Sequence, residues 1–302
     1  KITKGHSFLG GFRLLDKEKA YWYLTLTVCA WGSLYVVSKV VLAQLPVVTT
    51  LFMRYLIAGV ALFFVVRKVG FERIERADYK YIFFIGFVGY FVSIAAQLWG
   101  IQLANASLAA LVNALNPVCI LVLALIFLQE KIRAYQLVAV AAAMAGIYIV
   151  VGGAAGEGQL AGAMASMASV LCWSLMSVLV RKITRKYNPV VVTAYGIWIA
   201  LACALPASLY ELSQTETHWD WALAPALLYL GLICTALPHV LWNQSLSLLE
   251  AGRCALFYPL QPMTAALLGW MFLNESLSFS FLLGAVLIVG GVLISVLGER
   301  FA

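Results

Sequence analysis

The chain has 302 residues, of which 64% are hydrophobic and 11% are charged. Soluble domains average about 25% charged residues, so this composition excludes an ordinary water-soluble fold. The net charge of +7 would by itself fit a nucleic-acid partner, but the positions of the basic residues explain it without one.

Long apolar stretches without acidic residues divide the chain into ten expected membrane spans. The stretches are continuously apolar, whereas the strands of membrane barrels alternate polar and apolar residues. Helices are the remaining way to satisfy the backbone in lipid, so we predict an all-α polytopic membrane protein with ten transmembrane helices. In chain order, the expected spans are 21–42, 47–66, 81–99, 105–128, 134–151, 159–180, 190–210, 222–244, 254–273 and 279–297.

The basic residues predict the orientation of these helices. With a cytoplasmic N-terminus and alternating spans, all but two of the 20 Lys and Arg residues fall on the cytoplasmic side, and the external loops carry acidic residues instead. This distribution follows the positive-inside rule, so we expect both termini to be cytoplasmic. Contact with the lipid bilayer, whose inner leaflet is anionic, then accounts for the net charge, and we expect no nucleic-acid partner.

A phrase in the first half of the chain returns in the second half. Residues 116–131 read NPVCILVLALIFLQEK and residues 261–276 read QPMTAALLGWMFLNES, so that a proline, a phenylalanine, a leucine and a glutamate recur in the same register. Near the beginning of each half, Trp31 aligns with Trp173. The two halves therefore read as two copies of one unit.

Each copy holds five spans, and because five is odd the second copy would cross the bilayer upside down. We predict a cytoplasmic N-terminal segment at 1–20, a first five-helix repeat at 21–151 and a second, inverted five-helix repeat at 157–298. Inverted repeats are typical of transporters, in which two halves expose a site near the membrane midplane to each side in turn. The alternative is a duplication that serves packing alone.

At these residues the chain resembles the drug/metabolite transporter superfamily, and specifically its ten-helix EamA-type metabolite exporters. The resemblance rests on Trp31 and the glycine after it, with Lys39 further along the same span, on Arg54, and on the repeated phrase that runs from proline to glutamate. It covers the chain from residue 20 to residue 298. It implies two interlocked five-helix bundles around a central cavity, export of small metabolites such as amino acids, and a multi-pass location in the plasma membrane, which is the bacterial inner membrane.

Lys39 and Arg54 are the two cations inside the expected spans, where a central charge costs roughly 2.5–3.5 kcal/mol and usually has a function. Lys39 either belongs to the site or anchors the helix at the interface. Arg54 either belongs to the site or gate, or bonds backbone carbonyls. Because the expected spans contain no Asp or Glu, His239 is the remaining group there that titrates near neutrality. It is either a possible proton-coupling residue or a hydrogen-bonded interior histidine.

Aromatic and polar side chains inside the spans are expected to face inward, because an amide facing lipid would be unsatisfied. Cavity lining and helix–helix contact are both inward roles. Asn113 and Asn116 open the fourth span, and Tyr258 and Gln261 are their repeat partners. The predicted substrate-binding residues are Trp31, Tyr35, Lys39, Arg54, Tyr90, Asn113, Trp173, Ser177, Trp242 and Tyr258.

Two prolines recur at equivalent places in the repeated phrase. Pro117 and Pro262 each lack the N–H that would bond the carbonyl four residues earlier, so local kinking is expected. We predict that both prolines are hinges, with passive kinks as the alternative.

The sequence therefore predicts an exporter of amino acids or related zwitterions that works by alternating access through an aromatic and amide-lined cavity. An importer of the same fold and a carrier of organic cations or drugs are the alternatives. An enzyme is not expected, because the chain shows no nucleophile–base pair and no cluster of metal ligands, so we also expect no metal or cofactor. The expected partners are a small-molecule substrate and the bilayer, and the choice between monomer and homodimer stays open.

Overall fold

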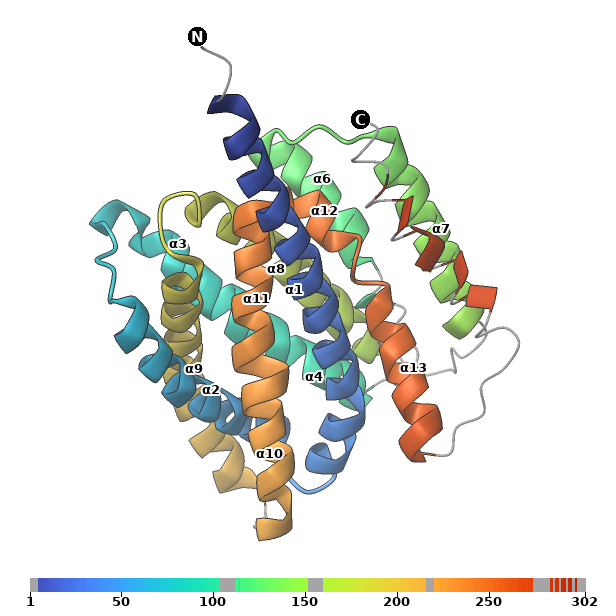
Figure 1. Cartoon of the computed structure of the whole chain (residues 1–302). Coiled ribbons are helices and arrows are strands. Elements are labelled where there is room, and N and C mark those ends of the chain that lie inside the picture. Colours follow the sequence, from blue (N-terminus) through green and yellow to red (C-terminus); the bar gives the residue numbers. More distant parts are fainter. Residues whose placement is uncertain are drawn as a thin grey trace.

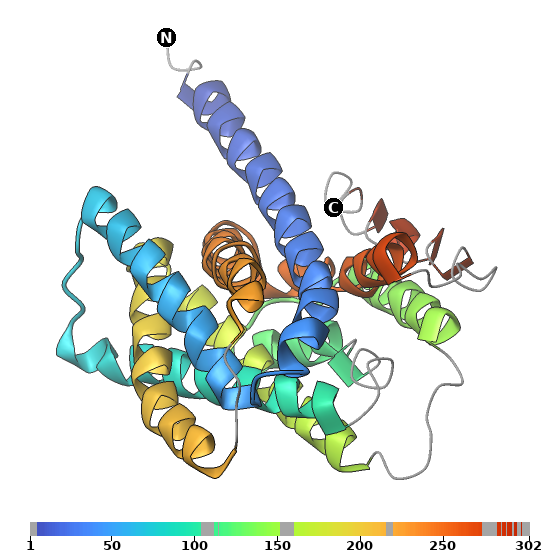
Figure 2. The same ribbon diagram turned by 90° about the horizontal axis from the view of Figure 1, so that it is seen from below.

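The computed structural model describes residues 5–103, 112–113, 115–151, 160–215 and 220–273, together with isolated positions between 283 and 297. All the regular elements in these ranges are helices. Figures 1 and 2 show them packed as a bundle in which the long helices run at moderate angles to one another.

The first half of the chain contains two long helices and a third that is assembled from shorter pieces. The elements are α1 (Gly5–Leu42), α2 (Val47–Val69), η1 (Arg76–Asp78), α3 (Tyr79–Phe84), the π-helical η2 (Ile85–Val92), α4 (Ser93–Leu103), α6 (Asn116–Leu128) and α7 (Ala134–Val151). The helix α1 begins well inside the segment that we expected to precede the first span.

The second half follows a similar order. Its elements are α8 (Leu160–Ile183), α9 (Pro189–Gln214), η3 (Trp221–Leu223), α10 (Ala224–Gly231), the π-helical η4 (Leu232–Ala236), α11 (Leu237–Leu248), α12 (Ala251–Ala255) and α13 (Leu260–Leu273). The two π-helical segments interrupt the third helix of each half at aligned positions of the repeat.

Six helical stretches in the described residues are long and apolar enough to cross a membrane. They are Lys17–Leu42, Val47–Val69, Arg76–Leu103, Leu160–Ile183, Pro189–Gln214 and Trp221–Leu248. Two expected spans are interrupted in the described residues: 105–128 has a turn at Leu115 before α6 begins, and 254–273 is broken between α12 and α13. The predicted span 279–297 lies almost entirely outside the described residues, so the count of ten stays a prediction.

One end of the bundle carries acidic residues. Glu211, in the last turn of α9, accepts hydrogen bonds from the backbone N–H groups of Val48 (3.1 Å) and Thr49 (2.7 Å) at the start of α2. A carboxylate is favourable there because a helix N-terminus carries partial positive charge. We call this the acidic end, and the opposite end, which holds the loops 70–78, 129–133 and 184–188, the basic end.

The aligned helices α1 and α8 run in opposite directions. Ser245 of α11 donates a hydrogen bond to the Ala20 carbonyl near the beginning of the apolar part of α1 (3.2 Å). One residue further along α11, the Leu246 carbonyl accepts from Arg181, close to the C-terminus of α8 (2.8 Å). The start of α1 and the end of α8 therefore meet at the basic end.

Glycines allow the third helix of each half to approach the other half closely. A Cβ on Gly86 of η2 would lie 2.7 Å from the Gly196 carbonyl of α9. A Cβ on Gly231 of α10 would lie 3.1 Å from the Arg54 carbonyl of α2 and 2.5 Å from the Ile57 side chain. Larger residues would push these helices apart, so the two aligned glycines fix the contact between halves.

Candidate functional site

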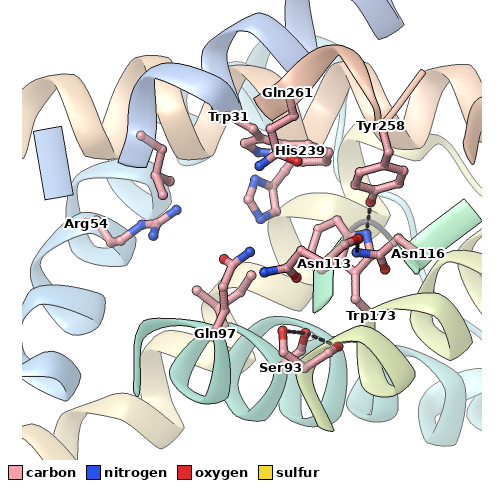
Figure 3. Close-up of a pocket in the computed structure, with 13 residues that line it drawn as sticks. Trp31, Arg54, Ser93, Gln97, Asn113, Asn116, Trp173, His239, Tyr258 and Gln261 are labelled. Atoms are coloured by element: carbon pink, nitrogen blue, oxygen red, sulfur yellow. Dashed lines mark hydrogen bonds between the residues drawn. The ribbon is translucent and has the colours of Figure 1, made fainter. Parts of the chain in front are cut away.

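A pocket lies between the two halves and is lined by residues of α1, α2, α4, α6, α8, α11 and α13 (Figure 3). The space, including the part open to solvent, is about 460 Å³. The predicted residues that line it are Trp31, Arg54, Asn113, Trp173, His239 and Tyr258, and the amides Asn116 and Gln261 join them. The lining residues that the sequence prediction missed are Leu34, Ser93, Ile94, Gln97 and Ser169.

Trp31 is the centre of an aromatic cluster at this pocket. Its ring centroid lies 5.3 Å from that of Trp173, with the rings nearly perpendicular, and 5.9 Å from that of Tyr258, with the rings stacked. The Trp173 indole N–H donates a hydrogen bond to the Tyr258 hydroxyl, which fixes both rings. The two aligned tryptophans of the repeat are thus in contact where the halves meet.

The remaining described members of the predicted set lie beside the pocket, in a second layer. These residues are Tyr35, Tyr90, Ser177 and Trp242. The side chain of Tyr35 bonds to that of Gln97, which does line the pocket. Tyr90 accepts a hydrogen bond from Asn243 Nδ2 (2.8 Å), and its ring lies 5.0 Å from that of His239. The placement of the Lys39 side chain lies outside the described residues.

The guanidinium group of Arg54 is buried and only partly satisfied. The residue is 1% exposed, and its Nε donates a hydrogen bond to Thr235 Oγ1 (2.9 Å). Among the residues that the structure describes, Nη1 has no hydrogen-bond partner. A buried charge with an open donor is costly unless a partner arrives, so this group is a strong candidate for contact with a ligand.

His239 faces the same space from α11 (Figure 3). It is also 1% exposed, and the Thr235 carbonyl one turn earlier interacts with the ring. No hydrogen bond with good geometry reaches either imidazole nitrogen from the described part of the chain. Both alternatives from the sequence, proton coupling and a hydrogen-bonded interior histidine, therefore stay predictions.

The prolines of the repeated phrase lie at helix beginnings. Pro117 is the second residue of α6, and Asn116 Nδ2 donates to the Asn113 carbonyl that lacks its usual donor (2.9 Å). In the other half, α13 begins at Leu260, before Pro262, and the Tyr258 carbonyl accepts from the Gln261 backbone (2.9 Å). Both prolines occupy the first turn of a helix, where they are tolerated, and the expected local distortion takes the form of a helix interruption just before each of them. Their role as hinges stays a prediction.

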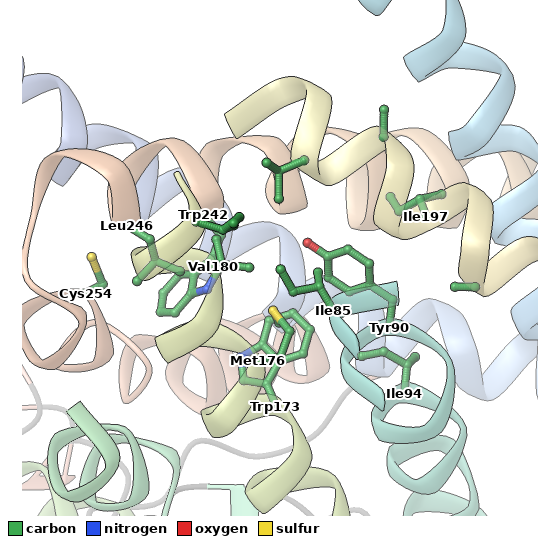
Figure 4. Close-up of a cluster of buried hydrophobic side chains, with 14 of the residues drawn as sticks. Ile85, Tyr90, Ile94, Trp173, Met176, Val180, Ile197, Trp242, Leu246 and Cys254 are labelled. Carbon is green, nitrogen blue, oxygen red and sulfur yellow. The ribbon is translucent and has the colours of Figure 1, made fainter. Parts of the chain in front are cut away.

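Apolar side chains fill the space between the pocket and the basic end. Figure 4 shows this cluster, in which Met176 and Val180 of α8 pack near Trp242 and Leu246 of α11. All of these side chains have 0% exposure. The pocket is therefore closed on this side.

Polar contacts seal the basic end beyond that cluster. Arg181 Nη1 donates to the carbonyls of Leu246 and Ser247 (2.8 Å each), and its Nε lies 3.6 Å from Glu130 Oε1. Glu130 in turn accepts from the Ala251 backbone at the start of α12 (3.1 Å). Burial raises the pKa of the Glu130 carboxyl, while Arg181 acts in the opposite direction. This cluster joins α8, α11 and α12 to the end of α6.

A second set of contacts joins loops of the two halves at the basic end. Lys186 Nζ lies 2.8 Å from Asp78 Oδ2, and the Tyr187 hydroxyl donates to the same oxygen (2.7 Å). The Asn188 backbone N–H donates to Glu72 Oε2 (2.7 Å). The loop after α8 is thereby held against the loop after α2.

Known proteins are similar to this chain in sequence and in fold. The sequence profile of the EamA-like transporter family matches residues 18–152 and, separately, residues 160–297. The uncharacterized transporter YetK of Bacillus subtilis (strain 168) is 25% identical over 303 residues, which is 96% of this chain and 91% of the relative. A crystal structure of another protein has a TM-score of 0.79 at 20% identity and covers 94% of this chain and 98% of its own, which shows a common fold.

Two further relatives carry names that state a cargo. A probable amino-acid metabolite efflux pump of Salmonella typhimurium (strain LT2) is 29% identical over 288 residues, or 91% of this chain and 94% of the relative. A probable terminal-alkyne amino-acid exporter of Streptantibioticus cattleyicolor is 25% identical over 280 residues, or 92% and 93%.

The long apolar helices, the pocket between the halves and these relatives define a membrane transporter rather than an enzyme. The chain belongs to the EamA-like transporter family, whose profile covers it almost from end to end.

Proposed function

We propose that this protein exports amino acids or related zwitterions across the bacterial inner membrane by alternating access. The observation that carries the proposal is Arg54, a buried cation that faces a pocket between the halves. An open guanidinium N–H is suited to a carboxylate, and the neighbouring aromatic rings are suited to an apolar side chain or an ammonium group. Two relatives with names that refer to amino-acid export agree with this class of solute.

Two inverted five-helix repeats would give the protein its two access states. Support comes from the double match to the family profile, from the opposite directions of α1 and α8, and from the reciprocal packing of Gly86 and Gly231 on the other half. In this arrangement the halves exchange conformations, so that the site opens first to one side and then to the other.

The predicted orientation in the membrane indicates which state of the transport cycle this conformation represents. If the positive-inside rule holds, the basic end is cytoplasmic. The apolar cluster and the Glu130–Arg181 contact would then close the cytoplasmic side, and the conformation belongs to the outward-facing or occluded part of the cycle. Separation of these contacts would be required before the site can load from the cytoplasm.

Flux in proteoliposomes tests the proposal. Purified protein is reconstituted, radiolabelled amino acids are loaded inside or outside, and release and uptake are followed under imposed solute and proton gradients. We expect saturable flux of at least one zwitterion, with empty vesicles and the variant Arg54→Gln as controls. Absence of protein-dependent flux for every amino acid tested would contradict the proposal, and obligatory uptake driven by an inward gradient would favour the importer.

An organic cation is disfavoured as the cargo by the charge of the site. The described lining of the pocket includes Arg54 and contains no Asp or Glu. A cationic drug would therefore meet a like charge without a counter-ion. Competition of labelled amino acid with a quaternary amine in the same vesicles distinguishes the two cargo classes, because the cation carrier predicts strong competition and the proposal predicts none.

A further inference from the structure

Two buried nitrogen-bearing side chains from different halves converge on one gap. Arg54 belongs to α2 and His239 to α11, and Figure 3 shows the guanidinium group and the imidazole ring directed into the same central space. Within the described ranges Nη1 of Arg54 has no hydrogen-bond partner, and the ring nitrogens of His239 have none with good geometry, although the Thr235 carbonyl interacts with the ring. An oxyanion placed between them would accept from the guanidinium and from an imidazole N–H at once.

The second half of the chain sets the direction of the Arg54 side chain. Thr235, in the π-helical η4, accepts from Arg54 Nε (2.9 Å) and donates to the Leu230 carbonyl (2.7 Å). His239 follows one turn later in α11. One stretch of helix thus holds the guanidinium through Nε and supplies the imidazole, while the edge that carries Nη1 is left for a ligand. π-helical turns are frequent at functional sites.

The charge balance of the pocket distinguishes the two ends of an amino acid. A solute ammonium would find aromatic faces and amide oxygens, but the lining that the structure describes offers it no carboxylate. It would also share the pocket with the positive charge of Arg54. A solute carboxylate, by contrast, meets the open Nη1 of Arg54 and, in the tautomer whose N–H faces this space, the imidazole of His239.

We propose that Arg54 and His239 jointly bind the carboxylate of the solute, that Thr235 is the positioning residue for Arg54, and that the solute ammonium is dispensable. The inference rests on the proposed transport function and narrows its substrate class. The recognised solutes are monocarboxylates with an aromatic or other apolar body, including deaminated acids as well as amino acids.

Three compounds with the same phenylethyl skeleton test this class directly. 3-Phenylpropionate carries the carboxylate alone, phenylalanine carries both groups, and phenethylamine carries the ammonium alone. Binding to the purified full chain in detergent is measured by calorimetric titration. We expect 3-phenylpropionate to bind within about threefold of phenylalanine or more tightly, and phenethylamine to bind at least about 30-fold more weakly.

Any other ranking overturns the inference. Tight binding of phenethylamine would show that the carboxylate is not required. A larger loss than threefold for 3-phenylpropionate would show that the ammonium is required, and binding of none of the three would show that the site does not recognise this class. In each of these cases, saturable flux of amino acids would still leave the proposed function standing, so the two failures are distinguishable.

Matched variants test the two residues that the inference adds. Thr235→Val and His239→Leu should each weaken 3-phenylpropionate binding by about 10- to 100-fold. The first removes the acceptor that holds Arg54 Nε, and the second removes the proposed imidazole donor to the carboxylate. Thr235→Ser and His239→Gln retain a polar contact and should stay within about threefold of the wild type. Thr184→Val is the control, since Thr184 likewise donates to its own helix, at the Val180 carbonyl (2.7 Å), but lies at the basic end.

The selectivity ratio separates positioning from a structural role. If Thr235→Val lowers binding of 3-phenylpropionate and phenethylamine equally, or if Thr235→Ser does not restore the wild-type ratio, Thr235 is not a positioning residue. Should a variant fail to fold, as judged by its unfolding midpoint without ligand, the ranking of the three compounds on the wild type decides the inference.

Discussion

Arg54 and Arg181 are both largely buried arginines, but their guanidinium groups have different surroundings. Arg181 donates to two carbonyls at the end of α11 and lies beside the Glu130 carboxylate. Arg54 has one hydroxyl partner, at Thr235, and faces a pocket with its Nη1 open toward it. The loss of one partner from a buried ion pair is strongly destabilising, whereas a buried cation without an anion carries a desolvation cost that a bound anion offsets. The comparison assigns Arg181 to the closure of the basic end and Arg54 to the solute.

The largest expected effect is at Arg54. Arg54→Gln keeps an N–H donor but shortens the side chain and removes the charge, and should weaken binding of an amino-acid carboxylate by at least about 100-fold. The unfolding midpoint should change little or rise, because the variant no longer buries an unpaired charge. Calorimetric titration and thermal unfolding of the same preparation measure both. Unchanged affinity would remove Arg54 from the site.

Arg181→Gln should show the opposite pattern. It leaves Glu130 buried without its cation, so we expect a loss of about 1–3 kcal/mol in the free energy of unfolding with solute affinity for the open site unchanged or higher. Denaturation in mixed micelles and calorimetric titration measure the two quantities. A loss of affinity that matches that of Arg54→Gln would erase the distinction between the two arginines.

Gly231→Ala should affect Arg54 indirectly. The added Cβ would lie 2.5 Å from Ile57 and 3.1 Å from the Arg54 carbonyl, so α2 must shift and carry the guanidinium with it. A displacement of this kind should cost about 10-fold in affinity. Gly59→Ala is the matched control on α2, because its Cβ would meet only side-chain atoms of Trp198 and Leu201, the nearest at 3.3 Å. Equal affinity losses in both variants would refute this explanation.

The smallest expected effect is a pH dependence at Glu130. Because the folded structure raises the pKa of this carboxyl, the folded state holds its proton to higher pH than the unfolded chain does. Its contribution is therefore fully present below the unfolded pKa of about 4.3 and is lost as the pH rises through the folded pKa. The stability difference between wild type and Glu130→Gln should shift in favour of the wild type as the pH falls through that window. Unfolding midpoints measured across the window, with no shift or the reverse one, would contradict the assignment.

Much of the site was predictable because polar groups in an apolar chain are conspicuous. Arg54, His239 and Asn113 stand out as the charged, titratable and amide groups of their expected spans, and all three line the pocket. The repeat alignment also paired Trp31 with Trp173 as equivalent positions, and in the structure the two rings are in contact. Gln97 is likewise an amide inside an expected span, so the same argument would have predicted that it lines the pocket.

Other features depend on tertiary contacts that a single sequence does not encode locally. The breaks before Pro117 and Pro262 follow from where each carbonyl finds a donor, and hydropathy shows only continuous apolar stretches there. Tyr35 and Trp242 share a helix face with lining residues but lie one layer behind them, because periodicity predicts a side of a helix and not a depth. The number of spans, the orientation in the membrane and the hinges remain predictions.

The central claim is that this transporter recognises its solute through the carboxylate at Arg54. Counterflow of labelled phenylalanine and labelled phenethylamine, measured in the same proteoliposomes with wild type and Arg54→Ala, tests it most directly. The account predicts that the variant loses phenylalanine exchange while any residual phenethylamine exchange is unchanged or increased. An equal loss of exchange for both compounds, in a variant that remains folded, would contradict it.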